Sequence, residues 1–312
     1  MSVVKTPGLE IAKTLGEGYY FTPLPYWHEG TDYTWAKLDL QEGDNEIWVY
    51  YGSETATDES DGDGVFEFFD DFSTWSGWTQ HSSGTVSQDT TTFGFPVLKK
   101  SNAGDPSGGY KEAGSFERGI CLRARVHRKS ADLSGANSDR IGLIDSNGDG
   151  YGVHMDHGND ELKIDKRDGF SATEYGNLSV SDVLDTWYVA EIRALDARVI
   201  AVLLPPGGSE ISTEVSDTSY NSFTRVYVFG GYTYYVDWIA VRKYSSSPPS
   251  ISYSSEESGS WTIDGHTFTK RKKVTITSSQ ALSGYQIQLD YSQWGEPGIK
   301  IMRKVQVVGE LG

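Results

Sequence analysis

The chain has 312 residues, of which 37% are hydrophobic and 13% aromatic, and its formal net charge is −17. This acidic balance disfavours a general nucleic-acid-binding protein, because such a protein needs a basic surface to replace counterions. It suits a cation-binding protein or an exposed protein of a virion or a cell surface. The 35 glycines, 19 tyrosines and 9 tryptophans, against 3 methionines, favour strands and turns over helical bundles.

The sequence predicts no membrane-spanning helix, because no run of about 18 apolar residues is present. Residues 1–7 do not form the apolar core of a signal peptide. A location outside the cell therefore requires that a leader has been removed, or another route such as virion release. The one cysteine, Cys121, lies in an alternating apolar run and is expected to be a small buried side chain that implies no oxidising compartment.

The first 66 residues contain short strand candidates, and an aromatic run follows them. Residues 33–40 alternate as a half-buried strand does, and residues 46–52 form a second strand after a polar turn. In the run at 65–72, Phe66 and Phe68 alternate with Glu67 and Phe69, so apolar side chains fall on both faces. Such a strand is covered on both sides, and we expect it at a junction between two domains.

Residues 67–247 form a longer series of alternating segments with almost no helical periodicity. Strands at this spacing indicate a two-sheet antiparallel sandwich. Residues 248–265 are rich in serine, which predicts a linker. Residues 266–312 again contain strand-like segments. The chain is therefore expected to be all-β, with a central sandwich between two terminal segments.

Several segments resemble a known family. The runs Pro-Tyr-Trp-His-Glu at 25–29, Ile-Trp-Val-Tyr-Tyr-Gly at 47–52 and Phe-Glu-Phe-Phe-Asp-Asp-Phe at 66–72 resemble the closing half of the domain of unknown function 2341. This is a β domain of archaeal, bacterial and viral surface-type proteins. The basic start and Val-Thr-Ile-Thr strand at 270–277, and the strand at 282–289, resemble its opening half. The two halves thus stand in inverted order around the sandwich.

Residues 70–244 resemble the concanavalin/laminin-G-like lectin sandwich that commonly follows this domain. The supporting motifs are Trp-Ser-Gly-Trp at 75–78, Gly-Leu-Ile-Asp at 142–145 and the strand at 235–244. The resemblance implies an antiparallel jelly-roll (concanavalin-like) sandwich over 67–247 and a smaller β-sandwich built from 1–66 and 266–312. The family has no settled activity, so the resemblance implies architecture more than function.

A candidate calcium loop begins at Asp145. Asp145, Asn147 and Asp149 place oxygens at alternate positions, a glycine is sixth and Asp156 is twelfth, which is the spacing of a calcium-binding loop. An Asn-Gly/Asp-Gly hairpin turn accounts for the same residues, since the twelfth residue is not Glu and the flanks are strands. The sequence favours the turn and leaves Ca²⁺ as a candidate cofactor held by these four side chains.

The sequence predicts no enzyme. Asp70 and Asp71 fall on opposite faces of a strand, so a structural role is expected rather than paired acid and base catalysis. His154 and His157 lack a third fixed ligand for a metal. The chain contains no Gly-x-Ser-x-Gly, no His-Glu-x-x-His and no phosphate-binding glycine loop, and it lacks the Glu-x-Asp-x-x-Glu spacing of concanavalin-fold glycosidases.

Two functions from different classes remain. As a lectin-like adhesion module, the protein would bind cell-surface glycans by stacking sugars on aromatic side chains, with Tyr232, Tyr234 and Trp238 as candidate ligand-binding residues. Core packing is the alternative use of these three rings.

The preferred function is a structural subunit of an extracellular or virion appendage. Residues 1–66 lack their opening strands, and a half sheet leaves backbone groups unpaired along an edge. If the tail of one chain completes the head of the next copy by strand addition, the contact is head-to-tail and generates a filament. Completion within one chain, as a circularly permuted domain, is the alternative. The strands assigned to this assembly carry Val274, Ile276, Tyr285, Ile287 and Leu289.

Overall fold

The computed structural model describes residues 19–101, 106–132, 138–181 and 183–306. The chain forms two compact units, which are Met1–Val65 together with Ser247–Gly312, here the terminal unit, and Phe66–Ser246, here the sandwich unit. The sequence placed these boundaries after residues 66 and 247. No helix within the described ranges is long and apolar enough to cross a membrane.

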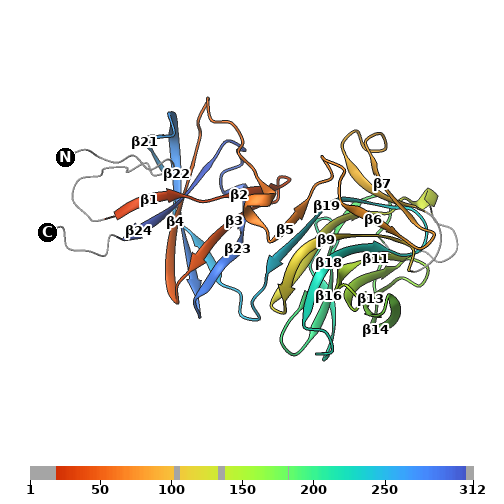
Figure 1. Ribbon diagram of the computed structural model, residues 1–312. Helices are drawn as coiled ribbons and strands as arrows, with labels where there is room; N and C mark the ends of the chain where they lie inside the picture. Colours follow the sequence, from red (N-terminus) through yellow and green to blue (C-terminus); the bar gives the residue numbers. More distant parts are fainter. Residues whose placement is uncertain (1–18, 102–105, 133–137, 182, 307–312) are drawn as a thin grey trace. The chain divides into compact units, whose positions relative to one another are not determined.

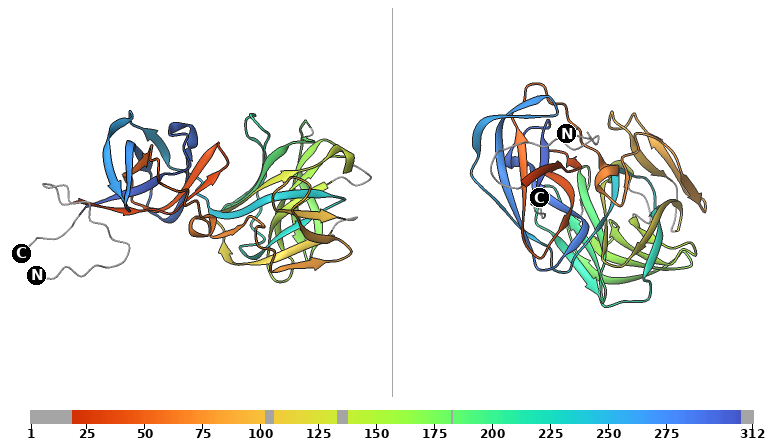
Figure 2. Two further views of the ribbon diagram at one scale, coloured as in Figure 1. Left: turned by 90° about the horizontal axis from the view of Figure 1, so that it is seen from above. Right: turned by 60° about the vertical axis from the view of Figure 1, so that its left-hand side comes forward.

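Two antiparallel sheets make up the described part of the terminal unit (Figure 1). The first, the β4 sheet, contains in spatial order β1 (Tyr19–Pro23), β24 (Lys300–Gln306), β4 (Gly43–Tyr51), β22 (His266–Ser278) and β20 (Ser250–Tyr253), with β21 (Glu257–Ile263) also paired to β22. The second, the β3 sheet, contains β2 (Tyr26–Glu29), β3 (Tyr33–Leu40) and β23 (Leu282–Asp290). Strands from the two ends of the chain therefore lie side by side, as the red and blue ribbons show in Figures 1 and 2.

The expected exchange between chains is corrected by this pairing. Strand β22 pairs with β4 of the same chain, and β23 pairs with β3. The five side chains assigned to assembly are all buried in the core of their own terminal unit: Val274, Ile276, Tyr285, Ile287 and Leu289. The tail reaches its own head because the chain enters and leaves the sandwich unit on neighbouring antiparallel strands, β5 (Phe68–Asp70) and β19 (Tyr234–Lys243).

The expected linker at 248–265 is also corrected. Strands β20 and β21 lie within it, and both pair with β22. In β20 the serines alternate with Ile251 and Tyr253, which pack against the core of the terminal unit. The serine-rich composition hides this period of two, which is the pattern of a half-buried strand.

The sandwich unit consists of two larger antiparallel sheets over its described residues. The β10 sheet contains β17 (Ile211–Val215), β16 (Val199–Leu204), β15 (Trp187–Ala194), β10 (Ile120–His127), β19, β8 (Val97–Ser101) and β7 (Thr85–Asp89), with β5 paired to β19. The β12 sheet contains β14 (Ser171–Ser179), β13 (Glu161–Asp168), β12 (Gly150–Asp156), β11 (Ser138–Ile144), β18 (Ser222–Phe229), β9 (Gly108–Glu117) and β6 (Trp78–His81). The helical segments are single turns: α1 (Gly62–Val65), η1 (Ser130–Asp132) and η2 (Tyr291–Gln293). The expected all-β architecture is confirmed.

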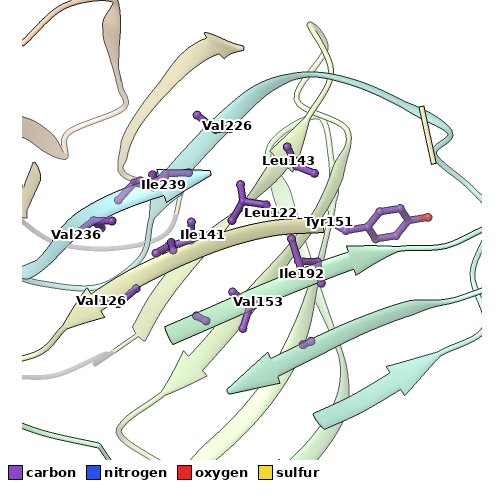
Figure 3. Close-up of a cluster of buried hydrophobic side chains, with 14 of the residues drawn as sticks. Leu122, Val126, Ile141, Leu143, Tyr151, Val153, Ile192, Val226, Val236 and Ile239 are labelled. Carbon is purple, nitrogen blue, oxygen red and sulfur yellow. The ribbon is translucent and has the colours of Figure 1, made fainter. Parts of the chain in front are cut away.

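The two sheets of the sandwich unit enclose one hydrophobic core (Figure 3). Leu122 and Val126 from β10 meet Ile141 and Leu143 from β11 in this core, and all four are at most 1% exposed. Each buried side chain of this size stabilises the fold by about 1.5–3 kcal/mol relative to exposure. Arg123 and His127, which directly follow Leu122 and Val126 in sequence, therefore lie on the outer face of the β10 sheet.

Cys121 also lies among these alternate residues and is a buried free thiol. Burial, and then the nearby Glu191 carboxylate, raises the pKa of Cys121 to about 12. The thiol is therefore protonated at neutral pH and unreactive as a nucleophile.

Candidate functional site

A group of aromatic rings gathers at one end of the outer face of the β10 sheet. Phe93 and Phe95 come from the loop between β7 and β8, whereas His127, Trp187 and Tyr235 come from β10, β15 and β19. Register brings the last three together, since His127 pairs with Trp187 on one side and with Tyr235 on the other. The ring centroid of Phe93 lies 4.9 Å from His127, 4.8 Å from Trp187 and 5.1 Å from Tyr235. These five residues are called the aromatic platform.

The outermost ring of the platform is Phe95, which is 38% exposed. Its centroid lies 6.0 Å from both Phe93 and Trp187, which are half-buried. Tyr33 and Tyr175 are exposed to a similar extent, but neither contacts another aromatic ring of the described residues. The platform thus presents one exposed ring, Phe95, beside the half-buried Phe93 and Trp187, while His127 at 6% and Tyr235 at 4% exposure are buried. An exposed ring joined to partly exposed aromatic neighbours indicates an interaction surface.

The loop that carries Phe93 and Phe95 starts in a fixed turn. One carboxylate oxygen of Asp89 accepts hydrogen bonds from the backbone N–H groups of Thr91 at 2.8 Å and Thr92 at 2.9 Å, and both threonine hydroxyls also donate to this carboxylate. Burial opposes ionisation of Asp89, but the bonds from Thr92 and Thr91 outweigh it and hold the pKa well below its usual range. The loop is therefore ordered before any ligand arrives, which reduces the entropic cost of binding.

Three cationic side chains stack against the platform. Lys129 Nζ lies 5.1 Å from the ring centroid of Phe93 and 5.5 Å from that of Tyr235, and Lys99 Nζ lies 5.8 Å from Tyr235. The Arg125 guanidinium lies 4.9 Å from the Trp187 ring. Distances of this size permit cation–π attraction.

The acidic groups near the platform have other bonds. Asp237 pairs with Arg125 at 2.6 Å, and Asp185 accepts a hydrogen bond from the backbone N–H of Ser130. Burial, and then the charge of Lys129, lowers the pKa of His127, so its imidazole is neutral at pH 7. Within the described ranges, neither Lys99 nor Lys129 has a carboxylate at ion-pair distance.

The ligand-binding residues predicted from sequence are mostly core residues. Tyr234 is fully buried, and its hydroxyl donates to the backbone carbonyl of Phe229 at 2.6 Å and lies 3.1 Å from that of Arg140. Trp238 is 5% exposed, and Tyr232 is half-buried. The prediction chose the right strand but the wrong face for Tyr234, because its neighbour Tyr235 points outward. Phe93, Phe95 and Trp187 were missed, although Phe-Gly-Phe-Pro at 93–96 is an aromatic pair in a polar loop and could have been noticed.

The predicted calcium ligands do not converge. Asp145 accepts hydrogen bonds from the backbone N–H groups of Asn147 at 2.8 Å and Asp149 at 2.9 Å, which is a hairpin turn. Asp156 lies at the far end of β12, where it accepts a hydrogen bond from Lys163. Since β11 and β12 are antiparallel, their whole length separates Asp156 from the turn. In the part of the chain that the structure describes, no three His, Cys, Asp or Glu side chains form a group that could hold a metal ion.

The acidic pair at the junction has the expected structural geometry. Asp70 accepts hydrogen bonds from the backbone N–H of Phe72 and the indole N–H of Trp78, and it pairs with Lys111 at 2.8 Å. Asp71 accepts a bond from the backbone N–H of Ser73. Both carboxylates thus fix the turn that begins the sandwich unit.

A second aromatic group lies on the outer face of the β12 sheet. His81 stacks on Phe170 at 4.1 Å, and Tyr110 and Phe229 lie beside them. The cations there have carboxylate partners, since Arg225 pairs with Glu112 at 2.5 Å and Arg167 with Asp165 at 2.6 Å. The cations beside this second group are therefore already paired with carboxylates, whereas Lys99 and Lys129 at the platform are not, among the described residues.

Comparison with known proteins supports part of the resemblance described above. Residues 18–81 match the family described as a domain of unknown function, DUF2341. This segment contains the motifs assigned to the closing half. The assignment of residues 270–289 to an opening half stays a prediction.

A relative and several solved structures are also similar. An uncharacterized protein of Methanocaldococcus jannaschii, MJ1394, is 31% identical over 204 residues, which cover 64% of this chain and 20% of that protein. The chain therefore spans about a fifth of the length of this relative.

Among solved structures, the carbohydrate-binding module CBM66 from Bacillus subtilis has a TM-score of 0.40 at 16% identity and covers 51% of this chain and 91% of that one. The galectin LEC-6 of Caenorhabditis elegans has a TM-score of 0.34 at 15% identity, covering 46% and 94% of the two chains. A family 16 endo-glucanase from Bacteroides ovatus has a TM-score of 0.40 at 11% identity, covering 56% and 99%. With TM-scores below 0.5, these likenesses establish neither a ligand nor an activity for this chain.

Proposed function

We propose that the sandwich unit is a non-catalytic, lectin-like glycan-binding module, and that the aromatic platform is its sugar-binding surface. The observation that carries this proposal is the exposed ring of Phe95. This ring lies on the loop whose start is fixed by Asp89, and it is grouped with Phe93 of the same loop and with Trp187 of β15. Sugars present apolar C–H faces, and these pack against exposed aromatic rings. Proteins that are named for carbohydrate binding occur among the similar structures, but the proposal rests on the platform.

The surroundings of the rings suit a sugar as well. A saccharide needs a few polar groups beside its apolar contact, because buried hydroxyls must be hydrogen-bonded. Lys99, Lys129 and Arg125, which stack against rings of the platform, provide N–H donors beside it. If its ligand is a glycan, we expect the protein to act outside the cell or at the cell surface.

Binding without turnover is the expected activity. Glycoside hydrolysis requires two carboxyl groups placed on either side of the scissile bond. Burial raises the pKa of Asp237, but this carboxylate is paired with Arg125, and Asp185 is bonded to Ser130. The acidic groups of the platform thus hold the protein's own cations and backbone.

The test compares two exposed aromatic side chains of nearly equal exposure, Phe95 at 38% and Tyr175 at 37%. We expect a glycan array to identify ligands for the wild-type chain, and titration calorimetry to show that Phe95→Ala weakens binding by about tenfold or more, which corresponds to about 1.4 kcal/mol. Tyr175→Ala should bind as the wild type does. The proposal fails if no glycan binds, if Phe95→Ala retains full affinity, or if the bound glycan is hydrolysed.

A further inference from the structure

We propose that the platform selects acidic saccharides, and that Lys99 and Lys129 form a subsite for the carboxylate of a uronic acid. This inference rests on the proposed glycan binding and adds the class of sugar. Both ammonium groups lie within 6 Å of the centroid of one ring, that of Tyr235, so this ring has a cation contributed by each of two neighbouring segments. Phe93, which is half-buried and lies 5.1 Å from Tyr235, is the accessible apolar ring beside them.

The two lysines differ from most of the chain's other lysines. Carboxylates outnumber cationic side chains by 44 to 27. Several other lysines pair with one: Lys111–Asp70 at 2.8 Å, Lys163–Asp156 at 2.7 Å, Lys166–Asp217 at 2.7 Å and Lys300–Glu59 at 2.5 Å. Lys99 and Lys129 both approach the Tyr235 ring and have no carboxylate at ion-pair distance among the described residues. In a protein of net charge −17, two such cations beside one aromatic group mark a place for an external anion.

No other charged group of the described residues forms an ion pair with these lysines. The Asp185 carboxylate and Lys129 attract each other through space, from beyond ion-pair distance, while Asp185 accepts a hydrogen bond from the backbone N–H of Ser130. Asp237 is held by Arg125, and His127 is neutral because its pKa is lowered. Two ammonium groups and one arginine thus face a mainly aromatic surface, and a ligand carboxylate placed there would accept charge-assisted hydrogen bonds.

A carboxylate on a sugar ring fits this arrangement better than a free anion does. A free anion gains only the ammonium groups, whereas a uronic acid also places its C–H face on the rings of the platform. The lysines then provide selectivity between acidic and neutral sugars of the same shape.

The experiment uses matched pairs of oligosaccharides. Tetrasaccharides of galacturonate, glucuronate and mannuronate are compared with their carboxyl-reduced, neutral counterparts by titration calorimetry with the full chain. We expect at least one acidic member to bind about tenfold or more tightly than its reduced partner, and this preference to shrink as salt rises from 50 to about 500 mM. The double variant Lys99→Gln, Lys129→Gln should lose the preference while it still binds the neutral partner.

The matched control is Lys270→Gln in the terminal unit, because Lys270 also stacks on a tyrosine ring, at 5.9 Å, but has Glu256 at 3.8 Å. It should leave the preference unchanged. Equal affinity for acidic and reduced sugars, or a preference that survives in the double variant, overturns the acidic subsite while leaving glycan binding intact. Binding of a sulfated neutral tetrasaccharide in place of every uronate overturns the carboxylate assignment. If the wild type binds no saccharide, both proposals fall.

Discussion

The two ends of the outer face of the β10 sheet hold positive charge in different ways. At one end, Glu191 is fully buried and accepts a hydrogen bond from Arg123 at 2.5 Å, with Arg193 at 2.6 Å and Arg242 at 3.5 Å. The ring of Tyr244 lies 4.9 Å from the guanidinium groups of both Arg193 and Arg242. At the other end, Lys99 and Lys129 lie over the rings of the platform without such a carboxylate.

This difference separates charged groups that stabilise the fold from charged groups that are available to a ligand. A buried carboxylate between guanidinium groups is stable only while its partners remain, because each charge has lost its hydration. The nearby cations outweigh burial and hold the pKa of Glu191 well below its usual range. Lys99 and Lys129 are only half-buried and have no such carboxylate among the described residues, so a ligand can reach their ammonium groups. One end of the same sheet face therefore contributes to stability, and the other is available for binding.

The largest effect is expected at the buried end. Glu191→Gln removes the counter-charge from three guanidinium groups, so the free energy of unfolding of the sandwich unit should fall by about 3–5 kcal/mol. For a unit of this size the midpoint of thermal unfolding should fall by about 10 °C. The control is Glu214→Gln, since Glu214 pairs with Arg198 at the surface with side chains 57% and 44% exposed, and a surface pair contributes at most about 1 kcal/mol. Calorimetry of both variants checks the contrast.

The comparison of the two ends would fail if Glu191→Gln altered glycan affinity as much as Phe95→Ala does. The two ends would then act as one unit. Equal midpoints for Glu191→Gln and Glu214→Gln would show that burial of the carboxylate adds no stability.

The second largest effect, a pH-dependent change of about 3 kcal/mol in the free energy of unfolding, is expected from His154 on the β12 sheet. His154 is 1% exposed on β12, and burial, followed by the charge of Arg140, lowers its pKa to about 4. Among the described residues neither ring nitrogen has a hydrogen bond, although Nδ1 lies 3.4 Å from Glu174. The unfolded chain takes up a proton near the usual pKa of 6.5, whereas the folded chain does so only near 4. Stability should therefore fall as pH drops from about 6.5 to 4, by about 3 kcal/mol.

The measurement is urea unfolding of the wild type and of His154→Gln at pH 7, 5.5 and 4. Carboxylates titrate in both proteins, so the difference between them reports the imidazole together with its charge effect on Asp156 and Glu174. We expect the wild type to lose more stability than the variant across this window. Parallel curves would show that His154 is protonated equally in the folded and unfolded chains.

The sequence predicted much of the fold because period-two alternation survives in most strands. Leu122 and Val126, or Val274 and Ile276, are recognisable as inward residues from sequence alone. The pattern could not show which sheet edge the tail would join, because alternation carries no information about distance in space. That depended on the pairing of β5 with β19, which returns the chain to its own head.

The site was harder to predict for a different reason. Tyr234 and Tyr235 are adjacent, chemically alike and both buried, yet Tyr234 packs in the core of the sandwich unit with its hydroxyl bonded to the Phe229 carbonyl, whereas Tyr235 contacts Phe93 in the platform. Only the register of β19 against β10 separates them. Phe95 lies in a loop, where no periodicity marks a face, and its grouping with Trp187 joins residues far apart in the chain.

The smallest effect on stability is expected at the platform itself. Phe95→Ala combined with Lys129→Ala removes an exposed ring and a cation–π contact, each of which contributes about 0.5–1 kcal/mol at an exposed site. Neither residue supplies a hydrogen bond to the sheet ladder or a side chain to the core of the sandwich unit. The free energy of unfolding in urea should therefore fall by only about 1–2 kcal/mol, while glycan affinity falls by about tenfold or more. Trp187→Ala serves as the contrast, because this half-buried ring contacts Phe93, His127 and Arg125 and should cost more stability. If the double variant destabilises the unit as strongly as Glu191→Gln, the platform is part of the folding framework and the division between the two ends of the sheet face is wrong.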